Sequence, residues 1–347
     1  MSTNPALVVA YGSANMVSGD GLTVGGAPSL STRIGFSDVS AVASGAWVSS
    51  SSSDTTGITG TVIGRDSTGA VQTQIVVLNG TTPVSGSQAW QRLLQGSVSG
   101  TAIGDLAFLQ ITPIVTGTAQ SAANTTGIIA PQIVVQSGQG ASLTVEDICL
   151  ITNNTPAGVQ FQLRKAVAIN TDTVSVNKDW GTIPTSSTTY AWYNGMLFES
   201  SPNQITKIQR IFDNCAADVV GGSSRTFYAK GFVVNNSTTT AVTQAGVTIS
   251  STTPALPAGA TMEFGMGSGF ADSQTIANRQ TAPAGITFTT GGLPVSSGVP
   301  GAGTGNLPPG AAPNTAGAAA IWFALTLPAG SQPFNGFASV QTSGTST

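Results

Sequence analysis

The sequence contains no histidine. Histidine is the usual general base beside a serine or cysteine nucleophile, and it is the commonest metal ligand. Its absence therefore excludes Ser-His-Asp and Cys-His catalysis and the most frequent type of metal site. Charged residues are also scarce, at 7% of the 347 residues, against about 25% in ordinary soluble proteins. Few charged side chains are therefore available to form a catalytic centre.

Positive charge is particularly sparse. The chain has 11 lysine and arginine residues and a net charge of −3, and its one basic cluster is Arg164 next to Lys165. A nucleic-acid surface needs a basic stripe that displaces counterions, so we expect no nucleic-acid partner. No apolar run approaches the ~20 residues of a membrane helix, and residues 1–11 lack the parts of a standard signal peptide. These features predict synthesis in the cytoplasm and no membrane partner.

Cysteine is limited to two residues, Cys149 and Cys215. Their spacing does not decide between a disulfide and two separate thiols. The simpler interpretation is that both are small apolar residues of the core.

The short acidic motifs do not form a catalytic set. Asp54-Thr-Thr-Gly57 and Asp66-Ser-Thr-Gly69 faintly resemble the Asp-Thr-Gly of aspartic proteases, but aspartate followed by hydroxyl residues and glycine is typical of turns. Glu146 and Asp147 form the one adjacent acidic pair, and on a strand they would point to opposite faces. We expect this pair to be solvated or to contact another subunit.

Neither the glycine-rich segments nor the acidic residues have the spacing of a ligand site. Residues 265–269 and 301–305 lack the Gly-Lys-Ser/Thr of a phosphate loop, and no group of acids has the spacing of a calcium loop. We therefore predict no catalytic, cofactor-binding or metal-binding residues, no cofactor, no small-molecule substrate and no enzyme activity.

What the sequence does contain is a series of short strand patterns. Hydrophobic residues make up 40% of the chain, glycine contributes 43 residues, and the mean hydropathy is +0.20. Runs rich in β-branched residues alternate with Gly, Asn, Pro and Ser, which indicates antiparallel β-sandwiches, Ig-like or jelly-roll-like. The predicted strands are 71–78, 105–115, 131–136, 142–153, 159–169, 225–236, 241–250, 260–267, 284–290 and 318–329.

Helical spacing is confined to two segments. In residues 87–98, Trp90, Leu93 and Leu94 lie at positions i, i+3 and i+4. Residues 201–219 carry an apolar stripe at similar spacing, although its central part also alternates as a strand would. We predict a helix at the first segment and leave helix and strand open at the second.

These patterns predict an all-β chain of two antiparallel β-sandwich domains. The first domain covers 46–185 and the second covers 203–347, with an aromatic connector at 186–202. Residues 1–45 form an N-terminal arm or the first strands of the first domain. Residues 289–317 are rich in Gly, Pro and Ala, and we expect them to form a long loop.

Aromatic residues gather in and near the connector. A sugar-binding platform would use such rings, but tyrosine and tryptophan are also enriched where domains or subunits meet. We favour a plug between the two domains or a subunit interface. The candidate interaction surface comprises Trp180, Tyr190, Trp192, Tyr193 and Phe198.

Four segments carry a resemblance to a known class of protein. Residues 74–109 have a strand, an Asn-Gly-Thr-Thr turn, an amphipathic stretch and a Gly-led strand, and residues 225–250 have a Tyr-Ala-Lys strand before an Asn-rich turn. These segments, with 276–290 and 320–330, resemble virion structural proteins of tailed bacteriophages. The pattern in those proteins is more basic after the tryptophan, where this chain has Phe323 and Ala324.

The resemblance implies a non-enzymatic virion protein. Our first expectation is a capsid decoration or cement protein on the virion surface that bridges subunits of the major capsid protein. Copies of the chain itself are also expected partners, as a trimer, with the N-terminal arm and the 289–317 loop lying across neighbours. The alternatives are a tail or head-tail fibre component and an exported bacterial adhesin or glycan-binding protein.

Overall fold

The chain is all-β in the part that its structure describes. The computed structural model describes residues 8–16, 21–126, 129–153, 161–201, 204–212, 222–235, 241–253, 256–290, 293–294, 307, 317–331 and 337–346. Within these ranges the one helical element is a short 3-10 helix, η1 (Gln139–Ser142), and every other regular element is a strand. The predicted all-β class is therefore confirmed.

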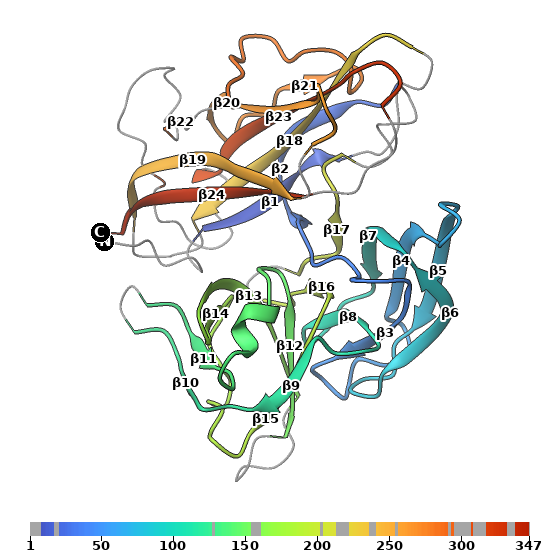
Figure 1. Ribbon diagram of the computed structural model, residues 1–347, viewed down its shortest axis with the longest axis vertical. Coiled ribbons are helices and arrows are strands. Elements are labelled where there is room, and N and C mark those ends of the chain that lie inside the picture. Colours follow the sequence, from blue (N-terminus) through green and yellow to red (C-terminus); the bar gives the residue numbers. More distant parts are fainter. Residues whose placement is uncertain are drawn as a thin grey trace. The chain divides into compact units, whose positions relative to one another are not determined.

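The chain folds into two compact units (Figure 1). Unit 1 combines Leu7–Ile34 with Arg210–Thr347, and unit 2 contains Gly35–Gln209. This division differs from the expected one. The first two strands belong with the C-terminal part of the chain, and residues 186–202 form part of unit 2 instead of a connector.

Unit 1 is built on a long antiparallel sheet. Its strands follow the order β20-β23-β18-β1-β2, and β21 pairs with β2. A second sheet has the order β22-β19-β24. The first sheet comprises β1 (Val8–Asn15), β2 (Val24–Ile34), β18 (Arg225–Asn235), β20 (Thr261–Phe270), β21 (Thr275–Ile276) and β23 (Ala319–Leu327), and the second comprises β19 (Val242–Thr253), β22 (Leu293–Pro294) and β24 (Phe337–Ser346).

The two faces of the long sheet in unit 1 have different coverings. On one face, Phe264 and Phe323 pack against Val247 of β19. On the other, Trp322 packs against Val24 and Ile276, with side chains of the segment that follows β21 beside it. Alternation along β23 explains this arrangement, because neighbouring residues of a strand face opposite sides of the sheet.

Unit 2 contains three groups of strands. One has the order β17-β7-β4-β5, the second β16-β8-β3-β6, and the third β10-β11-β14-β13-β12-β15-β9. Their bounds are β3 (Ala43–Ser49), β4 (Thr59–Arg65), β5 (Val71–Val77), β6 (Val84–Trp90), β7 (Arg92–Ser99), β8 (Leu106–Gln110), β9 (Val115–Thr118), β10 (Ser121–Ala123), β11 (Gln132–Val134), β12 (Ile148–Asn153), β13 (Gln162–Asn170), β14 (Thr173–Val176), β15 (Thr189–Tyr193), β16 (Gly195–Phe198) and β17 (Lys207–Gln209).

The β16-β8-β3-β6 sheet is covered on both faces at its centre. Every residue of β8 and β16 is buried. On one face, Val48 and Leu109 pack against Ile148 of the third sheet. On the opposite face Trp47 lies over Gly60 of β4, where an added Cβ would come within 2.5 Å of the indole ring. Only glycine permits this approach of β4 to the tryptophan.

Two sequence predictions for secondary structure are wrong. Residues 87–98 form the end of β6 and most of β7, with a break at Gln91, and not a helix. Trp90, Leu93 and Leu94 are buried, but they belong to two strands of different sheets. The strand predicted at 284–290 is also missing, apart from one bridge between Thr289 and Phe264. In the second helix candidate, residues 207–209 form β17 and residues 213–219 lie outside the described residues.

The predicted 289–317 loop contributes to the core of unit 1. Most of it lies outside the described residues, but Leu307 is fully buried and exchanges backbone hydrogen bonds of 2.8 and 3.0 Å with Val242. Leu293 and Pro294 pair with β19. Deleting the whole segment would therefore remove part of a core as well as a loop.

Replacing Leu307 by alanine is expected to lower the free energy of unfolding by about 2–5 kcal/mol, because it leaves a cavity beside Phe264 and Val247. Urea unfolding followed by circular dichroism measures the change. Ile103→Ala is the matched control, since that side chain is 71% exposed and should cost far less. Equal effects of the two substitutions would contradict the core position of Leu307.

Candidate functional site

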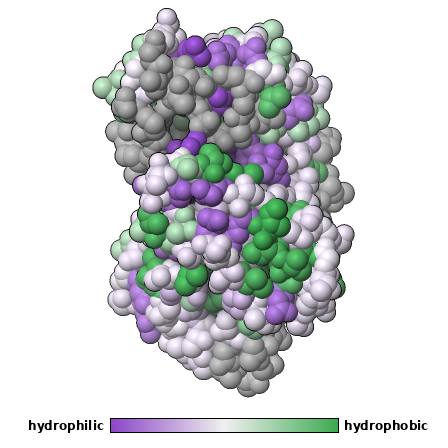
Figure 2. Space-filling view, turned by 90° about the vertical axis from the view of Figure 1, so that its right-hand side faces the viewer, coloured by the Kyte–Doolittle hydropathy of each residue, from purple (hydrophilic) through white to green (hydrophobic). Residues whose placement is uncertain are grey.

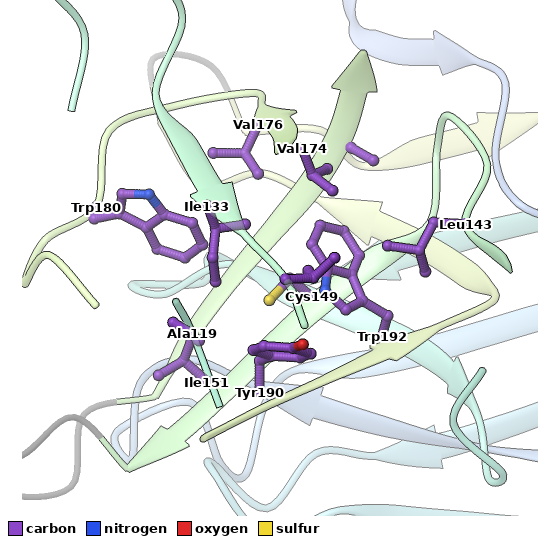
Figure 3. Packing of buried hydrophobic residues seen from close by; sticks show 12 residues of the cluster. Ala119, Ile133, Leu143, Cys149, Ile151, Val174, Val176, Trp180, Tyr190 and Trp192 are labelled. Atoms are coloured by element: carbon purple, nitrogen blue, oxygen red, sulfur yellow. The ribbon is translucent and has the colours of Figure 1, made fainter. Parts of the chain in front are cut away.

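The predicted aromatic surface is part of the interior of unit 2. Trp180, Tyr190 and Trp192 pack around Cys149 and Ile133 in one core cluster (Figure 3). The Trp180 indole donates a 3.1 Å hydrogen bond to the Gln132 carbonyl. These three rings are therefore brought together as we expected, but as core residues with no free ring face.

Tyr190 has polar partners inside the same cluster. Its hydroxyl accepts a 2.8 Å hydrogen bond from the Gln136 amide and donates a 2.6 Å bond to Oε1 of Gln139. Burial raises the pKa of the Tyr190 phenol. The hydroxyl therefore joins β15 to the turn before η1 and to η1 itself, and it donates its proton within the fold.

The other two aromatic residues lie apart from this cluster. Phe198 is buried beside Trp47, with ring centroids 5.2 Å apart. Tyr193 is half-buried and packs at the edge of the core around Leu109 and Ile148. A plug between domains or a sugar platform at these five residues does not fit their burial. Trp192→Ala would report on folding before it reported on binding to sugars.

Asp105 is the centre of a buried charged cluster in unit 2. Its carboxylate accepts a 2.6 Å bond from Lys178 and a 3.0 Å bond from the Ser200 amide. The Arg164 guanidinium lies 3.7 Å from the same carboxylate and also donates to the Asp179 carbonyl at 3.0 Å. The expected basic cluster at Arg164 is therefore turned inward, where it joins four segments of the chain.

Lys230 is a buried cation in unit 1. Its side chain is 0% exposed and donates to the carbonyls of Gly26, Asp272 and Gln274 at 3.0, 2.7 and 3.1 Å. The Asp272 carboxylate lies 3.5 Å away, and the ammonium sits 5.1 Å from the Phe232 ring centroid and 5.3 Å from that of Trp322. Burial lowers the pKa of Lys230 to about 8, against the opposing effect of Asp272.

The Lys230 arrangement holds two segments against β18. The three acceptors belong to β2 and to the stretch just before β21. Three carbonyls use all three protons of an ammonium group. We therefore interpret Lys230 as an internal tie and not as a nucleophile.

The acidic pair Glu146–Asp147 behaves only partly as expected. Glu146 forms a 2.8 Å ion pair with Lys165. Asp147 is fully buried, and its carboxylate accepts hydrogen bonds from Ser37 (2.5 Å), Asn194 (3.0 Å) and the Thr144 amide (2.6 Å). Burial raises the pKa of Asp147. The prediction of a solvated pair or subunit contact is therefore wrong for Asp147.

The two Asp-x-Thr-Gly-like motifs are turns. Asp66 accepts bonds from the backbone amides of Thr68 and Ala70 at 2.8 and 3.1 Å, and its side-chain bonds to Thr68 and Gln72 lower its pKa to about 2. Asp54 is buried and also accepts from the distant amides of Ile103 and Gly104. The turn prediction is confirmed at both positions, and the long-range role of Asp54 had no local sequence signal.

Cys149 is a free, fully buried thiol, and burial raises its pKa far above the ordinary value. This confirms the simpler interpretation for Cys149. Cys215 lies outside the described residues. A raised pKa leaves little thiolate at neutral pH, so Cys149 has no reactive character.

The described residues contain neither a metal-binding cluster nor a membrane-spanning helix. No group of three or more cysteine and acidic side chains there could hold a metal ion. In the same part of the chain, no helix has the length and apolar character needed to cross a membrane. Sequence reasoning did not identify the buried side chains that bond to distant segments of the chain, which are Asp54, Asp105, Asp147 and Lys230.

Comparison of the chain with protein families, with curated proteins and with solved structures finds no match. The resemblance to bacteriophage virion proteins therefore remains a prediction from four sequence segments.

Proposed function

We propose that this chain is a non-enzymatic structural protein of a tailed-bacteriophage virion and that its role is capsid decoration. In that role it would bind the outer surface of the head and bridge subunits of the major capsid protein. The proposal rests on the sequence resemblance and on the way the chain uses its polar groups.

One observation supports a non-enzymatic role: the buried charged side chains form hydrogen bonds and ion pairs within the fold. Asp105 and Lys230 each bond to a backbone group of a distant segment, and Asp147 accepts hydrogen bonds from the distant side chains of Ser37 and Asn194. Ties of this kind hold loops and strands in fixed positions, which suits a rigid building block. A catalytic group needs instead a face that is open to substrate.

The proposed architecture is one β-sandwich-like domain for each unit, either Ig-like or jelly-roll-like. Packing of β19 on the long sheet of unit 1 and of Ile148 on the β8 sheet of unit 2 supports face-to-face layers. A trimer of such chains on a local three-fold axis would multiply weak contacts by avidity. An N-terminal arm is no longer part of the proposal, because residues 8–15 and 24–34 are strands of the chain's own sheets.

The second candidate in the same class is a tail or head-tail fibre component, which the fold accommodates equally well. The adhesin or glycan-binding alternative is weakened, because its aromatic residues Trp180, Tyr190 and Trp192 are buried. In the described residues, the large apolar side chains that are exposed are all aliphatic, and none of them is an aromatic ring.

An electron cryo-microscopy map of the particle that carries this protein would test the proposal. Stoichiometric density on the capsid lattice, fitted by the two units, is the expected result. Density confined to the tail or to a single vertex would overturn decoration in favour of the fibre role. Absence of the chain from purified particles would overturn the virion proposal itself.

A further inference from the structure

β5 is an edge strand with an exposed apolar row. It ends the order β17-β7-β4-β5, and within the described ranges it pairs only with β4. Val71, Ile75 and Val77 are 55%, 66% and 54% exposed. Figure 2 shows the side of the molecule on which β5 lies in Figure 1, and apolar side chains gather there. One strand therefore presents a large share of the exposed aliphatic side chains of unit 2.

The hydrogen-bonding groups of β5 divide evenly between its two edges. Leu78 donates to the Ile58 carbonyl, and Asp66 donates to the Ala70 carbonyl, both at 3.0 Å. The register between these points has no shift, so the even-numbered residues of β5 bond to β4. Alternation in an antiparallel ladder then directs the N–H and C=O groups of Val71, Thr73, Ile75 and Val77 to the free edge.

This edge lacks the usual protection against another strand. Natural edges carry lysine, proline, a bulge or an inward-pointing charge. The sequence of β5 is VQTQIVV, with no charged residue and no proline, and its pairing to β4 has no bulge. The edge is therefore suited to accept one more antiparallel strand.

The order of residues in β5 identifies the strand that fits best. Read outward from Gln74 in both directions, the residues of the exposed row are Thr73 and Ile75, then Val71 and Val77. An antiparallel copy of β5 centred on Gln74 would place Val71 opposite Val77, and Thr73 opposite Ile75. Every facing pair in the row is then β-branched, a combination that stabilises cross-strand contacts, and no like charges meet.

We propose that β5 pairs with β5 of a second copy of this chain, antiparallel and about a two-fold axis at Gln74. The four residues at the free edge form four facing pairs with two hydrogen bonds each, about eight in all. The two β17-β7-β4-β5 sheets become one continuous sheet, and the two apolar rows become one stripe. A two-fold contact uses the same surface on both copies, which the near-palindrome of β5 supplies.

This pairing goes beyond the proposed role in the virion and does not depend on it. It uses a two-fold axis, whereas the trimer proposed above uses a three-fold axis. Each can therefore fail alone, because self-association is measured on the isolated protein and particle binding on the virion.

Sedimentation of the isolated full chain over a range of concentrations tests the pairing. We expect the wild-type protein to form a two-fold pair, and we expect Ile75→Lys to weaken the pair about tenfold or more, since an edge lysine opposes strand addition. Thr73→Pro is a second variant: it removes an N–H that no strand in the described part of the chain uses, and proline is tolerated at such an edge. Gln95→Lys is the matched control, because it adds the same charge to the same face of the sheet away from the edge.

The register can be tested by cross-linking in a Cys215→Ser background. A Thr73→Cys protein mixed with an Ile75→Cys protein should form an intermolecular disulfide faster than either protein alone, because hydrogen-bonded partners lie ~5.5 Å apart between Cα atoms. A monomeric wild-type chain, or self-association unchanged by both Ile75→Lys and Thr73→Pro, would overturn the proposal. Equal cross-linking alone and in mixture would overturn the register centred on Gln74.

Discussion

Raising the pH from 8 to 10.5 is expected to increase the contribution of Lys230 to the free energy of unfolding by roughly 3 kcal/mol. The pKa of this lysine falls from an ordinary 10.5 to about 8 in the folded chain, and each pKa unit corresponds to ~1.4 kcal/mol. The side chain is fully buried, so solvent screening does not reduce the effect.

The sign of this dependence follows from proton binding. Between pH 8 and 10.5 the unfolded chain keeps the proton on Lys230, whereas the folded chain has released it. Stability rises with pH wherever the unfolded state binds more protons. Below pH 8 both states carry the proton, and the folded state bears the full cost of burying the charge.

Comparison with Lys230→Met isolates this contribution. Urea unfolding of both proteins at pH 7, 8, 9 and 10 should show a rise in the wild type that the variant lacks. At pH 7 we also expect the variant to be less stable by about 3–5 kcal/mol, because it leaves Asp272 and three carbonyls buried without their cation. Identical slopes against pH in the two proteins would contradict the lowered pKa.

Asp105→Ala is expected to destabilise the chain by about 3–5 kcal/mol. The substitution leaves Arg164 buried without its carboxylate and removes the acceptor of the Ser200 amide. Removing one partner of a buried charged cluster costs more than the pair itself contributes, because the remaining charge stays desolvated. Urea unfolding at neutral pH measures the loss.

Lys178→Met is the matched control for Asp105→Ala. It removes one ion pair of the same cluster, but the lysine side chain is 29% exposed and Asp105 keeps its bonds to Ser200. Its cost should be clearly smaller. If Lys178→Met lowers the free energy of unfolding as much as Asp105→Ala does, the Lys178–Asp105 ion pair alone stabilises the cluster. That result would contradict a central role for the other contacts of Asp105.

The sequence patterns located best those strands whose own residues have a high propensity for β-structure. Residues 71–78, 225–236 and 318–329 coincide closely with β5, β18 and β23, because β-branched and aromatic residues dominate them. Residues 142–153 were only half correct: η1 and a turn precede β12, and Glu146 adopts a positive φ of 79°. Backbone of that kind has no apolar pattern that would reveal it.

The aromatic prediction failed for a different reason. Tyr190 and Trp192 were grouped with Tyr193 because they are close in sequence, but neighbouring residues of β15 face opposite sides of the sheet. Their true partners, such as Ile133 and Cys149, come from distant segments. The same holds for Asp105 and Lys230. The groups that donate to Asp105 and the carbonyls that accept from Lys230 are brought close only by the tertiary fold. No spacing rule could have joined them.

The insertion of unit 2 between the two parts of unit 1 sets an order for synthesis. The strands β1 and β2 are translated before unit 2. β1 pairs with β2, but it also pairs with β18, which follows unit 2, with Val8 opposite Asn235. All of unit 2 is translated in between, and domains generally fold as units while the chain is made. Unit 2 can thus fold before β18, the second neighbour of β1, has been synthesised. The pairing of β1 with β18 consequently forms late, and closing the long loop between these two strands is slow.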